Sequence, residues 1–348
     1  MTTQHIYWFA YFNTEEPSVR YRAKYALEEL AAQHKLTYDL VFPGYSPLTV
    51  LKFVITFFSI IVARKPNSVI VFEKIHTQRI YATALKLLLR IKPDRTFYDI
   101  DDADYLKFPP ETIYHFIKHC SACTVGSQSI ADFACKMNKN VLLLTSPVVD
   151  HRHIKTYRNK ELVIGWIGYY NAHRESLMQL FFPSLKDVSI PVKLLLMGVT
   201  KQHHREELAN YFVGIKNVTL EIPQDIDWQN EDEIYRTIST IDIGIAPLLN
   251  TEINKAKSAF KLKQYMSCGI PVLGSGTGEN KVFLKHGING YVCDSSQDYE
   301  QHIMKISEMS DTEYGSLSAH ALDTKKLFSM HYYCTTLMHL LDIHTQQA

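Results

Sequence analysis

Residues 257–292, KSAFKLKQYMSCGIPVLGSGTGENKVFLKHGINGYV, hold the pattern that decides the fold of this chain. The pattern predicts an amphipathic helix, a buried strand, a glycine-rich loop, a second helix from Glu279 to Lys285, and a turn into another strand. Alternating glycines let backbone N–H groups approach an anion, and the start of the following helix favours negative charge. With the lysines of the first helix, this order indicates a site for the diphosphate of a nucleotide. Many α/β proteins use such glycines for tight turns alone, so the loop by itself leaves that interpretation open.

Strand-like and helical patterns alternate along the whole chain, as units of strand, helix and parallel strand require. The strand-like runs of the first half are Ile6–Tyr11, Tyr38–Phe42, Val69–Phe72, Thr96–Ile100, Ala122–Val125 and Val141–Leu144. Those of the second half are Leu162–Ile167, Val192–Met197, Val218–Ile222, Asp242–Ala246 and Pro271–Leu273. A polar stretch at His151–Lys160 marks the expected boundary, and 348 residues suit two domains of ordinary size. The sequence thus predicts an α/β chain with two doubly wound domains, residues 1–155 and 156–325, and a helical segment at residues 326–348.

The composition narrows the classes of function. Hydrophobic residues make up 46% of the chain and charged residues 21%, so each half can bury a core. A formal net charge of +1 gives no long-range attraction to nucleic acid, and we expect no nucleic-acid partner. The six cysteines lack the spacing of a disulfide framework, and the C-x-x-C of Cys120 and Cys123 has no second pair nearby. Reduced thiols and an N-terminus without a signal-peptide pattern predict a cytoplasmic protein.

Several short motifs of the opening stretch occur in the same order in one known family. FKLKQYM at 260–266 and GIPV at 269–272 are followed by Asn280 and by GING at 287–290. They resemble the nucleotide-sugar-binding half of family-4 glycosyltransferases (glycosyl transferases group 1), in a bacterial subgroup with an FKLxQYMxxGxPV motif. The likeness extends to LVIGWIG at 162–168, DIGIAPL at 242–248, YDIDDA at 98–103, FEK at 72–74, SVRYR at 18–22 and PVVD at 147–150. It implies the GT-B fold, in which two Rossmann-like domains face a central cleft and the C-terminal helix crosses back to the first domain.

The resemblance also implies which residues hold a nucleotide-sugar donor. Positive side chains and backbone N–H groups stabilise the leaving phosphates as the glycosidic bond breaks. The expected contacts to the donor diphosphate and sugar are Arg174, Lys257, Lys261, Gly276, Gly278, Glu279 and Asn280. The arginine and the two lysines also fit solvated helix faces. Gln264 takes the position of a Glu that holds the ribose hydroxyls in the wider family, and its amide can also bond them. Ala256 takes the position of the first Glu of the family's Glu-x7-Glu pair, so a usual contact to the donor sugar is missing and Lys257 is a partial substitute.

Three carboxylates within four residues, Asp99, Asp101 and Asp102, are the sharpest feature of the first half. Like charges this close repel one another unless something organises or solvates them. The resemblance aligns Asp101 beside the donor sugar, and we expect these carboxylates to be catalytic. They would position sugar hydroxyls in a retaining enzyme or act as general base in an inverting one, and a mostly retaining family favours retention. A cluster that only caps a helix and a loop is the alternative.

We expect no catalytic metal and no other cofactor, because metal-dependent DxD motifs belong to a different glycosyltransferase fold. The acceptor is expected on the first domain, and the candidate residues of its side are Arg20, Arg22, Glu73 and Lys74. The two arginines follow a polar loop where an acceptor phosphate could bind, and solvated residues of a first helical turn are the alternative.

The most apolar run, residues 48–63, is shorter than the ~20 residues that span a bilayer comfortably. It predicts a helix with a narrow polar stripe. One interpretation buries this helix against the first sheet. The other lays residues 48–65 on the inner face of a membrane, aided by Lys52, Arg64 and Lys65.

The sequence therefore predicts a glycosyltransferase that moves a sugar from a nucleoside-diphosphate sugar to a glycan or lipid-linked acceptor, in the synthesis of a bacterial surface polysaccharide. Two alternatives stay open: a non-catalytic sugar-nucleotide-binding scaffold of the same fold, and a GT-B sugar-nucleotide epimerase. The sequence does not identify the nucleotide base, the donor sugar, the acceptor or the oligomeric state.

Overall fold

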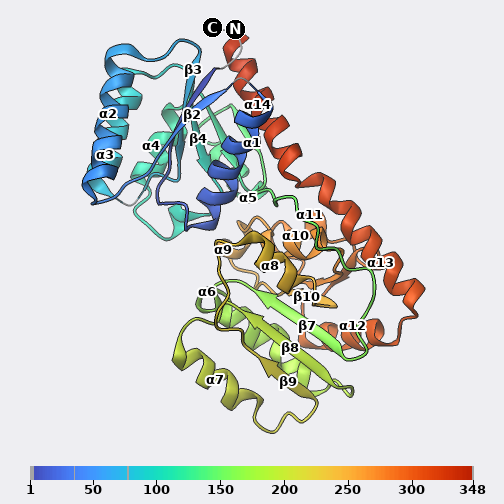
Figure 1. Cartoon of the computed structure of the whole chain (residues 1–348). Coiled ribbons are helices and arrows are strands. Elements are labelled where there is room, and N and C mark those ends of the chain that lie inside the picture. The colour runs from blue at the N-terminus through green and yellow to red at the C-terminus, as the bar shows by residue number, and fades with distance from the viewer. Residues whose placement is uncertain (1–3, 35, 77, 347–348) are drawn as a thin grey trace. The chain divides into compact units, whose positions relative to one another are not determined.

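Two six-stranded sheets organise the chain, and every neighbouring pair of strands in them runs parallel (Figure 1). The computed structural model describes residues 4–34, 36–76 and 78–346. Within these residues the chain divides into two compact units. Unit 1 holds the residues up to Val149, Ala256–Ser258 and the residues from Phe328, whereas unit 2 holds Asp150–Lys255 and Ala259–Leu327.

The sheet of unit 1 has the strand order β2-β1-β3-β4-β5-β6. Its strands are β1 (His5–Phe9), β2 (Thr37–Val41), β3 (Ser68–Glu73), β4 (Thr96–Ile100), β5 (Ala122–Val125) and β6 (Val141–Leu143). The helices of this unit are the π-helix η1 (Val19–Lys24), α1 (Tyr25–Gln33), α2 (Pro47–Ala63), α3 (Arg79–Ile91), the 3₁₀ turn η2 (Asp104–Leu106), α4 (Glu111–His119), α5 (Gln128–Ala134) and α14 (Met330–Gln346).

Both faces of this sheet are buried, so its strands are apolar on both sides. In β1, Tyr7 and Phe9 join a core with α2, α3, α4 and α5, while Ile6 and Trp8 point to the opposite core with α1 and α14. This division follows from the alternation of side chains along a strand. Helix α14 belongs to unit 1 because its apolar face, which includes Tyr333, completes the second core.

The sheet of unit 2 has the strand order β12-β11-β10-β7-β8-β9. Its strands are β7 (Leu162–Ile167), β8 (Val192–Met197), β9 (Val218–Glu221), β10 (Ile243–Ala246), β11 (Val272–Gly274) and β12 (Gly290–Val292). Its helical segments are α6 (Tyr170–Ser176), η3 (Leu177–Phe181), η4 (Phe182–Lys186), α7 (Gln202–Phe212), α8 (Glu231–Ile238), α9 (Glu252–Lys255), α10 (Phe260–Ser267), α11 (Asn280–Phe283), α12 (Ser296–Glu308), α13 (Asp311–Asp323) and η5 (Thr324–Leu327).

Helix α2 has an unusual environment for so apolar a segment. Of its seventeen residues, only Thr56, Phe57 and Ile60 are buried. None of the helices in the described residues is long and apolar enough to cross a membrane.

Candidate functional site

The order of strands in unit 2 defines where a ligand site can form. The chain starts at β7, moves outward through β8 and β9, and then returns to β10 on the other side of β7. Helices on opposite sides of such a switch point leave a crevice at the carboxyl ends of the strands. The residues that follow β7, β8, β10 and β11 are therefore the first place to look for a ligand site.

Two glycines let the loops after β7 and β8 approach each other backbone to backbone. Gly168 has φ +145° and Gly198 has φ +103°, backbone conformations that residues other than glycine rarely adopt. A Cβ atom on Gly198 would lie 2.0 Å from the carbonyl oxygen of Gly168, and one on Gly168 would lie 2.4 Å from Cε of Lys261. Glycine at these positions thus admits both the neighbouring loop and the lysine.

Lys261 reaches the end of β7 from the first turn of α10. Its Nζ lies 2.8 Å from Nε2 of His173 and 5.7 Å from the centre of the Trp166 ring. Because an ammonium group only donates hydrogen bonds, Nε2 of His173 is the acceptor of this one. The sequence analysis missed His173, which is 6% exposed. Its position in the loop and helix after β7, directly before the candidate residue Arg174, was the one sequence feature that could have indicated a role for His173.

Arg174 itself has a different environment. Its Nε lies 3.0 and 2.9 Å from the two carboxylate oxygens of Glu207, and its side chain is 44% exposed. The hydrogen bond to Glu207 raises the pKa of Arg174. The structure thus places this candidate donor residue in an ion pair on the surface of unit 2.

Polar contacts tie the glycine-rich loop after β11 to its surroundings. The backbone N–H of Gly276 donates to Asp294 at 2.8 Å, and Nδ2 of Asn280 donates to the carbonyl oxygen of Ala246 at 3.1 Å. Asn280 and Glu279 are both buried, and Gly278 has φ +61°. Asn280 thereby fixes the start of α11 against the end of β10.

Gln264 is a buried polar side chain on α10. It is 5% exposed, and its backbone carbonyl accepts from the hydroxyl of Ser267 at 2.8 Å. Its side-chain amide can both donate and accept hydrogen bonds, so this position is suited to a polar ligand group.

The segment that leads into α10 belongs to unit 1. Ala256 is 1% exposed and packs in the core of that unit. Ala259, with φ +57°, then starts α10. Lys257 lies in the same segment, and its charge contributes to lowering the pKa of Asp102. The structure therefore groups Lys257 with the carboxylates of unit 1.

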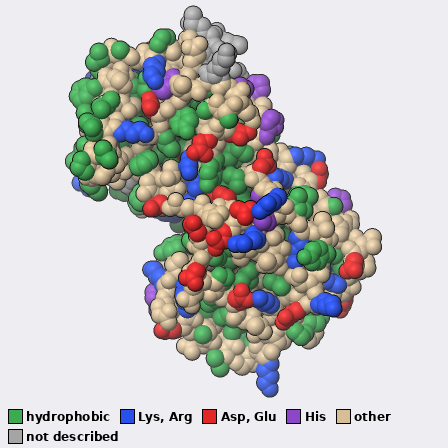
Figure 2. All heavy atoms as spheres, in the orientation of Figure 1, with side chains coloured by type: hydrophobic (Ala, Val, Ile, Leu, Met, Phe, Trp, Pro, Cys, Tyr) green, Lys and Arg blue, Asp and Glu red, His purple; other side chains and the backbone are tan. Residues whose placement is uncertain are grey.

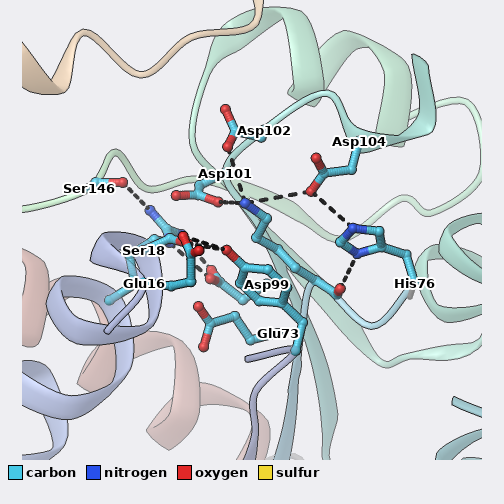
Figure 3. A network of polar contacts seen from close by, with 12 residues as sticks. Glu16, Ser18, Glu73, His76, Asp99, Asp101, Asp102, Asp104 and Ser146 are labelled. Atoms are coloured by element: carbon cyan, nitrogen blue, oxygen red, sulfur yellow. Dashed lines mark hydrogen bonds and ion pairs between the residues drawn. The ribbon is translucent and has the colours of Figure 1, made fainter. Parts of the chain in front are cut away.

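A second polar cluster lies at the carboxyl ends of β3 and β4 in unit 1 (Figure 3). Its centre is an ion pair between Arg22 and Asp99, both of which are fully buried. Nε of Arg22 donates to Asp99 at 2.8 Å and its Nη1 donates to the carbonyl oxygen of Leu144 at 2.7 Å. Thr124 donates a further hydrogen bond to Asp99. Asp99 therefore joins η1 to the strands β4 and β5 and is closed off from solvent.

Lys74 forms ion pairs with the neighbouring carboxylates Asp101, Asp102 and Asp104, which Figure 3 labels. Nζ lies 3.1 Å from Asp101, 3.1 Å from Asp102 and 3.5 Å from Asp104. Although burial opposes it, the charges of these carboxylates raise the pKa of Lys74. Lys74 also has φ +48°, an uncommon conformation for a residue other than glycine. Repulsion between the carboxylates is thus relieved by one buried cation.

The two adjacent aspartates have different electrostatic environments. Burial raises the pKa of Asp101, whereas Lys74 lowers the pKa of Asp102. The side chain of Asp102 is 36% exposed and that of Asp101 is 9% exposed. Asp102 is therefore the carboxylate of this cluster that is both ionised at neutral pH and open to solvent.

Glu73 is enclosed behind this cluster. Trp8 donates to its Oε2 at 2.8 Å, while its Oε1 has no hydrogen-bond partner. Burial raises the pKa of Glu73 to about 8. Arg20 is 4% exposed, and its Nη1 donates to the carbonyl oxygen of Glu15 at 3.1 Å. The four residues expected on the acceptor side, Arg20, Arg22, Glu73 and Lys74, are thus all buried.

Among the described residues, no group of three or more His, Cys, Asp or Glu side chains has the arrangement of a metal site. In the Asp cluster, the position between the carboxylates is taken by Nζ of Lys74.

Comparisons with known proteins agree with this architecture. Residues 161–309 match a family model described as glycosyl transferases group 1. No protein with a curated description matches the chain.

Solved structures match over nearly the whole length. Sucrose-phosphate synthase from Thermosynechococcus elongatus is 12% identical, with a TM-score of 0.72, and the match covers 99% of this chain and 100% of that one. A glycosyltransferase from Rickettsia africae is 8% identical, with a TM-score of 0.72 and complete coverage of both chains. Anabaena HepE in complex with UDP-glucose is 13% identical, with a TM-score of 0.64 and coverage of 97% and 99%. The predicted α/β fold of GT-B type, with two doubly wound Rossmann-like domains, is confirmed.

Proposed function

We propose that this chain is a glycosyltransferase that moves a sugar from a UDP-sugar to a glycan or lipid-linked acceptor in the synthesis of a bacterial surface polysaccharide. The observation that carries the proposal is the ammonium group of Lys261, held by His173 above Gly168 at the switch point of unit 2. The match of residues 161–309 to group 1 glycosyltransferases includes all three residues. UDP is the proposed nucleotide because the similar HepE structure contains UDP-glucose.

The donor would bind to unit 2. The charge of Lys261 neutralises the diphosphate as it leaves, and the amide of Gln264 bonds the ribose hydroxyls. The Gly276–Asn280 loop supplies backbone N–H groups after the Asp294 carboxylate gives up its contact with Gly276. Arg174 contributes once it exchanges Glu207 for a phosphate oxygen.

Unit 1 would supply the carboxylates that act on the sugar and the acceptor. Asp102 is ionised and open to solvent, so it is the best candidate to contact the donor sugar or an acceptor hydroxyl. Lys257 adds a positive charge beside it. Asp101 and Asp99 act through their ion pairs with Lys74 and Arg22, which hold the strand ends in place. The family resemblance supports retention of configuration, with the acceptor hydroxyl replacing UDP at the anomeric carbon.

The test combines binding and turnover. Thermal shifts with UDP, GDP, dTDP, CMP and NAD identify the nucleotide, because a ligand that binds only the folded state adds about 2.7 kcal/mol at ~100 times its dissociation constant. Lys261→Ala should weaken UDP binding about tenfold or more, whereas Lys281→Ala, an exposed lysine on α11, should not change it.

Turnover separates the proposal from its alternatives. Incubation with UDP-sugars and extracted glycan or lipid acceptors should release UDP, and NMR of the product reports the anomeric configuration. Binding without turnover would indicate a scaffold, and conversion of the donor without an acceptor would indicate an epimerase. No shift with any nucleotide would refute the donor site itself.

A further inference from the structure

Helices α2 and α3 carry many of the exposed large apolar side chains of the described residues. Ten aliphatic or aromatic side chains of these helices are 39–89% exposed. They are Leu48, Val50, Leu51, Val54, Ile55, Phe58 and Val62 on α2, and Ile80, Leu87 and Ile91 on α3. We call this set the α2–α3 face. Figure 2 shows hydrophobic side chains gathered over the part of unit 1 where Figure 1 draws these helices.

This exposure goes beyond the scattered apolar residues of an ordinary surface. Leu48 and Val62, near the two ends of α2, are 79% and 82% exposed, and Ile80 on α3 is 89% exposed. Contiguous apolar surface of this kind marks a place where something docks, because leaving it in water is unfavourable. A helix with apolar side chains around most of its circumference is typical of an apolar environment on both sides.

The exposed charges on α2, on α3 and on the segment between them have one sign, and the first exposed acidic residue that follows them in sequence is Asp94, just beyond α3. Between Pro47 and Pro93 the only acidic residue is Glu73, which is fully buried. Exposed basic residues in the same stretch are Lys52, Lys65, Arg79 and Arg90. Because the whole chain has a net charge of only +1, this positive charge is a local property of the face. Apolar residues mixed with lysine and arginine, without acidic residues, fit an anionic lipid surface.

A groove beside the face adds a second feature that favours lipid headgroups. It has a volume of about 650 Å³ and shares Leu87 with the face. Its polar lining consists of the cations Lys86 and Arg90 and of the histidines His115 and His119. The rings of the two histidines lie 4.6 Å apart, and Lys86 donates to the hydroxyl of Thr112 at 2.8 Å. A groove of this composition suits a phosphate group.

We propose that unit 1 docks on an anionic lipid bilayer through the α2–α3 face, with the aliphatic side chains among the acyl chains and the basic residues among the lipid phosphates. A second copy of the chain fits the same face less well. Symmetric contact would bring the basic residues of one face against those of the other, and like charges across an interface cost several kcal/mol. This inference does not depend on the chemistry proposed for the strand ends.

Flotation of the full-length protein with vesicles tests the proposal. Wild type should bind vesicles with about 30% phosphatidylglycerol more tightly than pure phosphatidylcholine, and added salt should weaken binding. Leu51→Ser with Ile55→Ser should reduce binding more than tenfold, because both side chains lose apolar area. Arg79→Glu with Arg90→Glu should reduce it by about fivefold or more per residue.

Matched controls lie on unit 2, where Val213 is 77% exposed and Lys216 is exposed. Val213→Ser with Lys216→Glu should bind vesicles like wild type. Thermal melting checks that each variant is folded, and the charge variants change only exposed residues. Equal binding of wild type and the α2–α3 variants overturns the proposal. A stable dimer of the wild type that becomes monomeric in Leu51→Ser with Ile55→Ser would also overturn the proposal, because a second copy of the chain would then cover the α2–α3 face.

Discussion

Both sheets of this protein carry polar groups at the carboxyl ends of their strands. The two clusters differ in which groups form them. In unit 1 the cluster consists of buried side-chain charges, with Arg22 on Asp99 and Lys74 among three other carboxylates. In unit 2 it consists of close backbone approaches at Gly168 and Gly198 and of few charges. The difference teaches that the same topological position can be filled by buried charge pairs or by close backbone approaches that bring a lysine to the strand ends.

The largest effect is expected from breaking the buried ion pair of unit 1. Arg22→Met should lower the free energy of unfolding by about 3–5 kcal/mol, because it leaves Asp99 charged and unpaired in the interior. The matched change in unit 2, Arg174→Met, removes an arginine whose side chain is 44% exposed and should cost less than about 1 kcal/mol. Urea denaturation measures both. Equal losses of unfolding free energy would show that the buried pair of Arg22 with Asp99 stabilises the fold no more than the exposed pair of Arg174 with Glu207.

In unit 2 the backbone, and not a side-chain charge, should be the sensitive element. Gly198→Ala places a Cβ atom 2.0 Å from the carbonyl oxygen of Gly168 in a left-handed conformation, and should cost about 2–3 kcal/mol. Gly214→Ala is the control, because its φ of +87° is similarly unfavourable but nothing lies within 4 Å. It should cost about 1 kcal/mol. Unfolding curves that coincide for the two variants would argue against a close approach of the loops.

The enclosed carboxyl of unit 1 predicts a dependence on pH. Glu73 has a pKa raised by burial from 4.5 to about 8, so the folded state holds its proton where the unfolded state has lost it. Stability from this group is complete below about pH 4.5 and is lost as the pH rises towards 8. At about 1.4 kcal/mol per pKa unit, we expect a loss of roughly 2 kcal/mol between pH 6 and 8.

Glu73→Gln keeps an acceptor for Trp8 and cannot lose a proton, so its stability should stay flat across this window. Glu207→Gln in unit 2 is the control, because hydrogen bonding from Arg174 lowers the pKa of Glu207 and its titration lies below the window. Denaturation at several pH values gives the slopes. A Glu73→Gln protein with the wild-type slope would assign the pH dependence to another group.

The sequence predicted the fold far better than it predicted these clusters. Strands β4 and β5 have the predicted bounds, because buried parallel strands are continuous apolar runs. The pairing of Arg22 with Asp99 joins residues 77 positions apart and depends on which strands become neighbours. His173 was missed for the same reason, since its contact with Lys261 spans 88 positions. The second helix of the opening stretch, predicted from Glu279 to Lys285, is shorter and covers Asn280–Phe283, with Leu284 already extended.

The smallest effect, and the sharpest test of the unit 2 cluster, concerns the contact between His173 and Lys261. His173→Ala should weaken UDP binding about fivefold, because the hydrogen bond that orients Lys261 makes a net contribution of roughly 1 kcal/mol. In a Lys261→Ala background the same change should have little further effect, since residues that act on one ligand group are not additive. His204→Ala is the control, because that buried histidine on α7 packs against Tyr170. Calorimetric titration of UDP gives the four affinities of the cycle. If the losses of UDP affinity in the two single variants add up in the double variant, His173 contacts the ligand independently of Lys261. Unit 2 would then hold two separate binding groups, whereas the geometry predicts that His173 only orients Lys261.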